Sequence, residues 1–388
     1  MYRTIIEPGE FEIAESLYET LRSHRLLVAL HKDAVATDVP PKCEYFVAST
    51  TFEKKTGGTR QLIELARKVG AKSIIVICEG AEKYCVESEL NGKLLRVSFP
   101  KPVLSQSREY MVLYVASLLH GTGLAVPREP ASCQLFELAE RVARADVSVF
   151  INGPTGSGKE VLSNFIHNNS SRDGRQFVAI NCAAIPENML EAMLFGHEKG
   201  SFTGASTANV GIIRAADGGT LLLDEVSEMS LGLQAKLLRA LQEKAVTPVG
   251  GTKTINVDVR VLSTSNRNMV VECQSGRFRE DLFYRLNVFP LTTIALAQRK
   301  KDILPIAIEL LLRHYKDLQT LPMLADCAIE RLQGHNWPGN VRELDNVLQR
   351  ATVMCDGLEI MAGDILFDHG VLAPMPPTAD RATESGHV

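Results

Sequence analysis

One segment of this sequence combines glycines with a lysine at a spacing that suits nucleotide chemistry. The apolar run Val147–Asn152 is followed by Gly153, Pro154, Thr155, Gly156, Ser157, Gly158, Lys159 and Glu160. This is the G-x-x-x-x-G-K spacing of a loop between a strand and a helix, whose backbone N–H groups surround the β- and γ-phosphates of a nucleotide. The lysine adds a positive charge, and the N-terminus of the next helix adds its dipole. Alone, the pattern also fits a glycine-rich turn with a surface lysine.

Two adjacent carboxylates follow another strand-like pattern. From Gly218 the chain reads Gly-Gly-Thr-Leu-Leu-Leu-Asp-Glu, which ends at Asp224 and Glu225. In an open α/β sheet the ligand lies outside the carboxyl ends of the strands. We therefore expect Asp224 to hold Mg²⁺ and Glu225 to activate a water for attack on the γ-phosphate. An acidic pair alone is more often a solvated strand end, but together with the loop it predicts hydrolysis of ATP.

Composition restricts the class of protein. At 388 residues the chain is long for one core, so two or three domains are expected. No apolar stretch reaches membrane-spanning length, and the N-terminus lacks a signal-peptide pattern. The eight cysteines form no C-x-x-C pair, which favours reduced thiols in a cytoplasmic protein over zinc ligands or disulfides. A net charge of −4 gives no general attraction to nucleic acid.

Changes in pattern along the chain separate three globular regions and a tail. Strand-like and helix-like segments alternate in the first two regions, which predicts α/β domains with mainly parallel sheets. A helical pattern follows, and the end of the chain has too few apolar residues to order itself. The expected parts are an α/β regulatory domain over 1–120, a linker over 121–133, an α/β ATPase subdomain over 134–300, a helical lid over 301–366 and a disordered tail over 367–388.

Several short motifs follow one another in a characteristic order. They are GPTGSGKE at 153–160, NCAA at 181–184, LFGHEKGSFTGA at 194–205, GGTLLLDE at 218–225, FREDLFYRLNV at 278–288 and WPGNVREL at 337–344. Together they closely resemble the AAA+ ATPase domain of bacterial enhancer-binding proteins, the activators of sigma-54 RNA polymerase. The resemblance implies a P-loop parallel-sheet domain with a C-terminal helical lid. It also implies ATP and Mg²⁺ as cofactors and assembly into a homo-oligomeric ring, expected to be a hexamer.

Other residues of the nucleotide site also have expected roles. Glu160 stands where many phosphate loops use Ser or Thr to bind Mg²⁺, so the metal is expected to be held chiefly by the strand-end aspartate and water. Asn181 is either an ordinary strand-end residue or an amide that holds Glu225 away from the attacking water. The resemblance implies that Asn266 is the first sensor of the γ-phosphate and that Arg342, on the lid, is the second.

A phenylalanine flanked by small residues is the most distinctive side chain outside the nucleotide site. Phe202 does not fit the core of a helix or strand, although single exposed apolar residues are common in soluble proteins. In the resembling family this loop touches sigma-54 in an ATP-dependent manner. The expected contact residues are Gly200, Ser201, Phe202, Thr203, Gly204 and Ala205, of which only Ser201 departs from the usual residue, alanine.

Two arginines, Arg279 and Arg285, lie in a segment that also contains Glu280 and Asp281. Such arginines commonly pair with acids on a solvated face. The resemblance implies instead that they are arginine fingers, which reach the γ-phosphate bound by the neighbouring subunit. An arginine supplied in trans is worth roughly 10³–10⁵ in rate. The active site would then be incomplete in a monomer.

Two places depart from the family pattern. The family usually has Pro-Leu-Arg-Glu-Arg at the hinge into the lid, where this chain has Ala295, Leu296, Ala297, Gln298 and Arg299. Met193 replaces a usual glutamate near the base of the Phe202 loop. We expect these changes to weaken the coupling between hydrolysis and loop movement more than hydrolysis itself.

The first region resembles a receiver domain in its alternation of strands and helices but not in its chemistry. A working receiver needs an acidic pair after the first strand and an aspartate after the third. Here Glu7 stands alone at the first place, and the third strand ends in Ala48, Ser49 and Thr50. Lys101 does match the receiver pattern. The region is either a degenerate receiver with a regulatory role or an unrelated α/β domain.

The residues after the lid show neither apolar helical periodicity nor clustered basic residues. A helix-turn-helix of the kind most such activators use does not fit there, so we expect no specific DNA binding by this chain alone. Either the protein acts without a DNA-binding domain of its own or the sequence is truncated. The prediction is an ATP-hydrolysing activator that remodels sigma-54 RNA polymerase, with flagellar gene control as the suggested pathway and no membrane association. The alternative is an auxiliary subunit in a hetero-oligomer with a DNA-bound activator.

Overall fold

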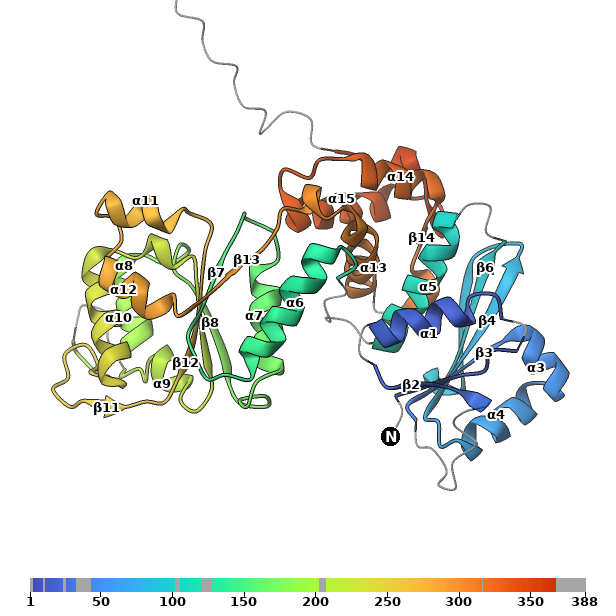
Figure 1. The fold of residues 1–388 in the computed structure, drawn as a ribbon, viewed down its shortest axis with the longest axis horizontal. Helices are drawn as coiled ribbons and strands as arrows, with labels where there is room; N and C mark the ends of the chain where they lie inside the picture. Colours follow the sequence, from blue (N-terminus) through green and yellow to red (C-terminus); the bar gives the residue numbers. More distant parts are fainter. Residues whose placement is uncertain are drawn as a thin grey trace, which may run out of the picture.

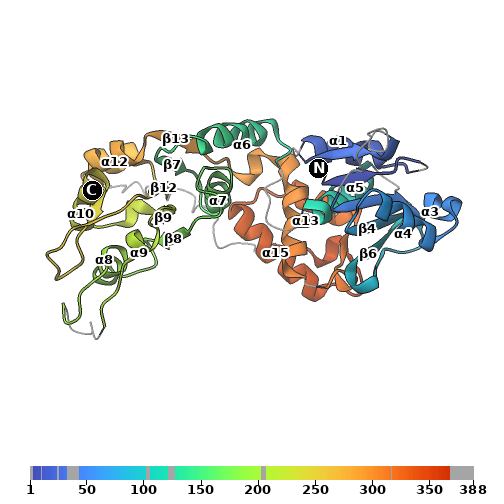
Figure 2. The same ribbon diagram turned by 90° about the horizontal axis from the view of Figure 1, so that it is seen from below.

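The computed structural model describes residues 3–9, 11–23, 26–32, 43–101, 105–120, 127–201, 207–315 and 317–367. Two sheet domains lie at opposite ends of an elongated molecule, and a group of helices joins them (Figures 1 and 2). The α/β fold class predicted from the sequence is confirmed for both domains. Within the described ranges, no helix is both long and apolar enough to cross a membrane.

The N-terminal sheet has six strands in the order β2-β1-β3-β4-β6-β5. Its parallel strands are β1 (Thr4–Ile6), β2 (Val28–Leu30), β3 (Tyr45–Ser49), β4 (Ser73–Ala81) and β6 (Leu94–Pro100). At one edge, β5 (Cys85–Glu89) runs antiparallel to β6, and the short helix η1 (Leu90–Gly92) links the two. The order of the parallel strands is that of flavodoxin-like folds, to which receivers belong. The receiver-like topology predicted for this region is therefore present.

Helices cover both faces of this sheet. The helices α3 (Thr50–Thr56) and α4 (Thr59–Lys68) lie on one face, and α1 (Ala14–Ser23) and α5 (Ser105–His120) lie on the other. Residues 110–116 of α5 are all buried. A helix that is apolar all round must be covered all round, and α5 is packed between the sheet and the helical lid (Figure 1).

The second sheet has five parallel strands in the order β13-β7-β12-β9-β8. They are β7 (Val149–Asn152), β8 (Phe177–Asn181), β9 (Thr220–Asp224), β12 (Arg260–Ser265) and β13 (Phe289–Thr292). The helices α6 (Pro130–Ala143) and α7 (Lys159–Asn168) pack on one face. On the other face lie α8 (Glu187–Phe195), α10 (Leu231–Glu243) and α12 (Glu280–Leu286). The central strands are short apolar runs, as expected when both faces of a parallel sheet are covered.

Shorter elements complete this domain. They are α9 (Ile212–Ala215), η2 (Val226–Glu228), α11 (Met269–Gln274) and a hairpin of β10 (Ala245–Val246) and β11 (Ile255–Asn256). Because parallel strands all end at one edge, β7, β9 and β12 bring the glycine-rich loop, the two carboxylates and Asn266 to the same edge. This edge faces the lid (Figure 1).

The lid consists of α13 (Ile303–His314), α14 (Asp326–Gly334) and α15 (Asn340–Met354). Its smaller elements are η3 (Leu296–Gln298), η4 (Lys300–Asp302), η5 (Leu318–Thr320), β14 (Met323–Leu324), β15 (Glu359–Ile360) and η6 (Ala362–Asp364). Buried side chains of the lid and of α1 and α5 form one continuous apolar cluster. At its edge the Ser107 hydroxyl donates to Asp326 (2.6 Å). The N-terminal domain is therefore packed on the lid.

Two predicted boundaries differ from the structure. Helix α6 starts at Pro130, since proline suits the first position of a helix, so the end of the predicted linker 121–133 is helical, whereas 121–126 lie outside the described residues. Phe367, assigned to the tail 367–388, stacks on His335 with ring centroids 4.0 Å apart. The rest of that tail lies outside the described residues.

Candidate nucleotide-binding site

The glycine-rich loop connects β7 to α7, as its spacing predicts. Gly156 and Gly158 have φ angles of +73° and +95°, a region that residues with a Cβ rarely adopt. A Cβ on Gly156 would also lie 2.6 Å from the carbonyl oxygen of Gly339 in the lid. Lys159, the first residue of α7, is buried, and its Nζ donates to two loop carbonyl oxygens at 3.0 and 3.4 Å. The loop is thus closed on itself and held against the lid.

The two predicted carboxylates lie at the end of β9, beside the loop. One oxygen of Asp224 accepts from the Thr264 hydroxyl (2.5 Å), and the other accepts from the side-chain amide of Asn181 (3.1 Å). Glu225 has a left-handed backbone conformation, with φ of +53°. Its two oxygens lie 3.1 Å from the Nζ of the loop lysine and 3.0 Å from the backbone nitrogen of Asn266. The two acids therefore have different partners at one edge of the sheet.

Asn181 bonds a different carboxylate from the one we expected. The sequence suggested that its amide holds Glu225, but it donates to Asp224, and its own oxygen accepts from the backbone nitrogen of Ala183 (2.9 Å). The register of the sheet explains the difference, because β8 pairs with β9 so that Asn181 lies opposite Asp224. Glu225 lies one residue beyond the paired strand, and its backbone N–H donates to the Thr264 hydroxyl on β12 instead.

The two predicted sensor residues approach the loop from opposite sides. Asn266 donates from its side chain to the Thr155 hydroxyl (2.9 Å). From the lid, Asn340 donates to the Thr155 carbonyl oxygen (3.0 Å), and the backbone N–H of Val341 donates to the next loop carbonyl oxygen (3.0 Å). Arg342 follows in α15 and lines the same cleft. The lid is thus bonded directly to the phosphate loop.

An open cleft of about 530 Å³ lies between these groups. Most of the predicted nucleotide-binding residues form its walls: Thr155, Gly156, Gly158, Lys159, Glu160, Asn181, Asp224, Glu225, Asn266 and Arg342. Among the described residues, no group of three or more acidic, histidine or cysteine side chains is placed to hold a metal ion alone. Mg²⁺ is commonly held by one or two carboxylates together with phosphate oxygens and water. Asp224 fits that arrangement with a nucleotide in the cleft.

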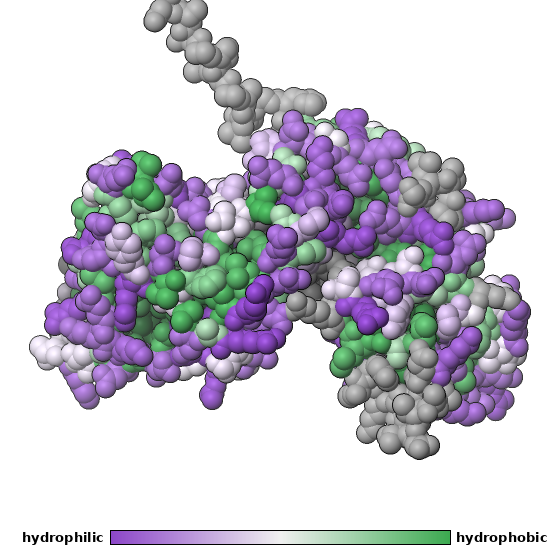
Figure 3. Space-filling model, viewed as in Figure 1, coloured by the Kyte–Doolittle hydropathy of each residue, from purple (hydrophilic) through white to green (hydrophobic). Residues whose placement is uncertain are grey.

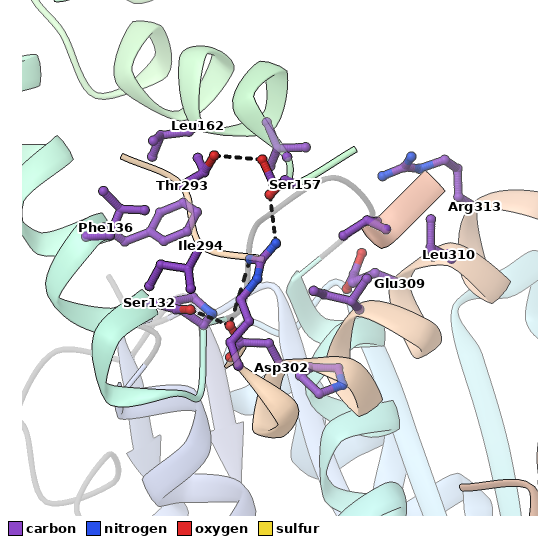
Figure 4. Close-up of a pocket in the computed structure, with 18 residues that line it drawn as sticks. Ser132, Phe136, Ser157, Leu162, Thr293, Ile294, Asp302, Glu309, Leu310 and Arg313 are labelled. Carbon is purple, nitrogen blue, oxygen red and sulfur yellow. Dashed lines mark hydrogen bonds and ion pairs between the residues drawn. The ribbon is translucent and has the colours of Figure 1, made fainter. Parts of the chain in front are cut away.

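A second, more apolar cavity adjoins the cleft (Figure 4). Its volume is about 140 Å³. It shares wall residues with the cleft, namely Gly158, Val161, Leu310, Arg313 and Val341. Further apolar walls come from α6, α7, the hinge into the lid and α13, and they include Leu135, Phe136, Leu162, Ile294, Pro305 and Ile306. The sequence did not predict this cavity, because these residues have the spacing of ordinary core positions and carry no motif.

Two residues at the ends of the altered hinge, Ile294 and Arg299, line this cavity. Ala295, Ala297 and Gln298 lie in or beside η3, and Arg299 follows them beneath the phosphate loop. Burial lowers the pKa of Arg299 below its usual value, and the neighbouring Asp302 opposes that shift. The arginine is thus the one ionisable residue kept at the hinge motif, and it is held in the interior.

The two predicted arginine fingers lie away from the cleft of their own chain. The Arg279 guanidinium makes two hydrogen bonds to Asp281 (3.0 and 2.7 Å), and Arg285 donates to a backbone carbonyl of α10 (2.9 Å). Neither is among the described residues that line the cleft. Beside them Tyr284 is 65% exposed and Val288 is 54% exposed. Hydrophobic side chains gather on this face of the second sheet domain (Figure 3).

Most of the predicted sigma-54 loop lies outside the described residues, namely Phe202, Thr203, Gly204 and Ala205. Gly200 and Ser201 end the stem on its N-terminal side. The stem touches the β10–β11 hairpin, since a Cβ on Gly250 would lie 2.7 Å from the Cβ of Ser201. The described end of the stem and the hairpin therefore lie side by side.

In the N-terminal sheet, the positions that would carry receiver chemistry make local contacts instead. Glu7 lies 2.6 Å from Nδ1 of His31 and accepts from the backbone nitrogen of Gly9 (3.2 Å). The Ser49 hydroxyl caps the first turn of α3, where it accepts a backbone N–H (3.1 Å), and it donates to the Gly9 carbonyl oxygen (3.2 Å). Lys101 is exposed.

Comparison with known protein families agrees with this geometry. The sigma-54 interaction domain matches residues 125–292, and the AAA+ ATPase lid domain matches residues 297–370. The chain is 58% identical over 241 residues to response regulator protein FleR of Pseudomonas aeruginosa, covering 62% of this chain and 51% of FleR. It is 44% identical over 286 residues to transcriptional regulatory protein FlbD of Caulobacter vibrioides, covering 73% of this chain and 62% of FlbD. The chain thus spans less than two thirds of these relatives.

A solved structure resembles both sheet domains and the lid. NtrX from Brucella abortus in complex with ATP matches at a TM-score of 0.58 and 27% identity, covering 94% of this chain and 87% of that chain. The complex of the same protein with ADP gives a TM-score of 0.58 at 26% identity. The family predicted from the motifs is confirmed: through residues 125–370, the chain belongs to the sigma-54-dependent activators that carry an AAA+ ATPase domain.

Proposed function

We propose that this protein hydrolyses ATP and uses the cycle to remodel sigma-54 RNA polymerase for promoter opening. The observation that carries the proposal is the ion pair of 3.1 Å between Lys159 and Glu225 at the cleft. A nucleotide phosphate would compete for the lysine, and Glu225 would then be released to accept a proton from the attacking water. Binding of the substrate and activation of the base would be linked in this way.

Some of the other residues would bind the phosphates of ATP, and others would bind its adenine. The loop N–H groups would hold the β- and γ-phosphates, and Asn266 and Arg342 would contact the γ-phosphate. Asp224 would hold Mg²⁺, which when bound neutralises charge on the phosphates. The apolar cavity beside Phe136 would take the adenine, because an uncharged flat ring suits an apolar cavity next to a polar site. That NtrX is solved with ATP and with ADP supports a nucleotide here.

Catalysis would be shared in a homo-oligomeric ring, which we propose is a hexamer. Arg279 and Arg285 would act on the nucleotide of the next subunit. They lie in the same segment as the exposed apolar side chains of Tyr284 and Val288, and exposed apolar surface is typical of a protein interface. A ring that acts on RNA polymerase would work in the cytoplasm.

The loop over residues 200–205 would carry the contact with sigma-54. Phe202→Ala should keep the ATPase rate within about twofold of wild type, because it is remote from the phosphate loop in sequence, while binding to sigma-54 with ADP–aluminium fluoride is lost. Glu225→Gln should lose ATP turnover and promoter opening together. Sigma-54 binding by Phe202→Ala at the wild-type level would refute the loop assignment.

The alternative function is that of an auxiliary subunit that joins another, DNA-bound activator. Ala297 and Gln298 favour it, because they remove two charges that the family usually has at the hinge. In transcription reactions with sigma-54 polymerase, the purified chain alone should open the promoter if it is an activator. Opening only after a DNA-binding activator is added would support the auxiliary role. Flagellar promoters are the first templates to use.

A further inference from the structure

Arg299 lies where the phosphate loop, the start of α6 and the base of the lid meet, in the wall of the apolar cavity. One Nη donates to the carbonyl oxygen of Ser157 (2.7 Å), and the other lies 3.9 Å from the Asp302 carboxylate. The side chain of Arg299 is 11% exposed and that of Asp302 is 2% exposed. Figure 4 shows Ser157 and Asp302 on opposite sides of this junction.

Asp302 fixes the surroundings of the arginine. One carboxylate oxygen accepts from the backbone nitrogens of Arg128 (2.6 Å) and Glu129 (2.7 Å) just before α6, and the other accepts from the Ser132 hydroxyl (2.5 Å). A buried carboxylate is tolerated when it is bonded in this way. These three bonds tie α6 to the lid base without using the arginine, so the cavity walls do not depend on Arg299 alone.

The guanidinium has one donor that the protein leaves unused. The Nε–H group of Arg299 is buried and has no acceptor among the described residues. A buried donor without an acceptor is costly, and a bound ligand commonly supplies the missing partner. The cavity is lined mostly by apolar residues and adjoins the phosphate cleft. A purine nucleoside offers both the flat ring and the ring nitrogen or hydroxyl acceptors.

We propose that Arg299 recognises the nucleoside half of the bound nucleotide, with its Nε–H donating to an acceptor on the base or ribose. The inference rests on the proposed ATPase function and extends it, because it assigns affinity for the nucleoside to a residue outside the phosphate-binding groups. It predicts that a change at Arg299 affects the affinities for ADP and for pyrophosphate differently. Affinity for ADP should depend on Arg299, whereas affinity for inorganic pyrophosphate, which fills only the phosphate cleft, should not.

The test is calorimetric binding of Mg²⁺–ADP and of Mg²⁺–pyrophosphate to the full chain. Arg299→Met should weaken ADP binding about tenfold, as for the loss of one buried charged hydrogen bond. Pyrophosphate binding should stay within about twofold of wild type. Arg299→Lys keeps the positive charge beside Asp302 but lacks the Nε–H, so it should weaken ADP binding similarly while the melting temperature without nucleotide stays near wild type. Arg60→Met, at an exposed arginine of α4 in the other domain, is the matched control and should change neither ligand.

The outcomes separate the two proposals. Equal losses of ADP and pyrophosphate affinity in both Arg299 variants would mean that the arginine only supports the loop, and would overturn the inference. Wild-type ADP affinity in Arg299→Lys would overturn it as well. If the wild-type chain binds ADP with neither variant affected, the nucleotide site stands and this inference falls. Absence of ADP binding to the wild-type chain would overturn the proposed ATPase function and the inference with it.

Discussion

The two sheets of this protein have similar architecture but differ at the carboxyl ends of their strands. In the second sheet, β9 ends at Asp224, and Glu225 and Asn266 directly follow β9 and β12; all three line an open cleft. In the N-terminal sheet, β1 and β3 end near Glu7 and Ser49, and these side chains bond nearby backbone groups or His31. A strand-end position that lines a cleft in one domain serves as a helix cap in the other.

The shared α/β fold does not by itself decide the chemistry of either sheet. Both sheets supply a polar edge, because parallel strands place their following loops together. Activity then depends on which side chains the loops carry and whether their polar groups are left open to a ligand. Lys159 and Glu225 bond each other, but both line the open cleft, where a phosphate would compete for the lysine. The Ser49 hydroxyl already has both a donor and an acceptor partner.

The largest expected effect is the loss of the open strand-end acid. Glu225→Gln should bind ATP but lower kcat roughly 10²–10⁴-fold, the usual contribution of a general base. Lys159→Ala should lose nucleotide binding itself. Glu7→Gln, at a strand end of the other sheet, is the matched control and should leave kcat within about twofold. Steady-state ATPase rates and ADP binding would check all three, and a Glu225→Gln enzyme as fast as wild type would remove the catalytic assignment.

A comparable effect is expected from the arginines that lie outside the cleft. Arg279→Ala and Arg285→Ala should each lower kcat by up to roughly 10³-fold, because charge in the transition state loses its partner in trans. Mixing either protein with Glu225→Gln protein should restore some turnover, since a few interfaces then combine an intact finger with an intact glutamate. ATPase activity per subunit that is independent of protein concentration, with no restoration on mixing, would show that neither arginine acts across an interface.

The sequence predicted the parts of the site that lie close together along the chain. The loop spacing and the acidic pair each fall within eight residues, so local pattern was enough to place Lys159 and Asp224. The predicted hydrogen-bond partner of Asn181 was wrong, because the true partner depends on the register of β8 against β9. The cavity beside Phe136 was missed, because its walls come from α6, α7 and the hinge and meet only when the lid is in place.

The same limit applies to the N-terminal domain. The apolar run in α5 predicts a buried helix, but nothing in it shows that the lid covers the outer side. The absence of an aspartate after β3 was visible in the sequence, whereas the use of Ser49 as the cap of α3 was not. Tertiary partners of apolar faces are a property of the whole chain and leave no local motif.

A smaller effect, on stability, is expected where β6 of the N-terminal sheet packs against α3. Arg96 on β6 makes two hydrogen bonds, of 2.6 and 2.7 Å, to Glu53 on α3, whose side chain is 7% exposed. Arg96→Met would leave this buried carboxylate without its charged partner, although the Thr59 hydroxyl would still donate to it (2.8 Å). We expect the unfolding free energy of the domain to fall by about 2–3 kcal/mol, below the full cost for a wholly buried pair because Arg96 is partly exposed. Arg60→Met, which breaks the exposed pair with Glu64, should cost less than about 0.5 kcal/mol.

The stabilisation by the Arg96–Glu53 pair should depend on pH. Hydrogen bonding from Arg96 holds the pKa of Glu53 below its usual value, against the effect of burial. The ionised pair therefore stabilises the fold above the pKa of the unfolded glutamate, about 4.3. That stabilisation is lost as the pH falls through the lower pKa of the folded state. Urea unfolding of the full chain should show the deficit of Arg96→Met at pH 7 and a smaller one near pH 4. A deficit independent of pH would mean that lost packing, not the ion pair, is responsible.

The smallest expected effect is none at all, and it concerns the strand ends of the N-terminal sheet. A phosphoryl donor such as acetyl phosphate modifies a receiver at a carboxylate after the third strand, and here that place holds Ser49, whose hydroxyl is bonded to the backbone on both sides. Glu7 lies nearby but is paired with His31. We therefore expect intact-mass measurement to find no acid-labile adduct on residues 1–120 after treatment, and ATPase activity to stay unchanged. Such an adduct would mean that this sheet edge is open to chemistry after all, and that the two sheets differ in the identity of the reacting group, not in its availability.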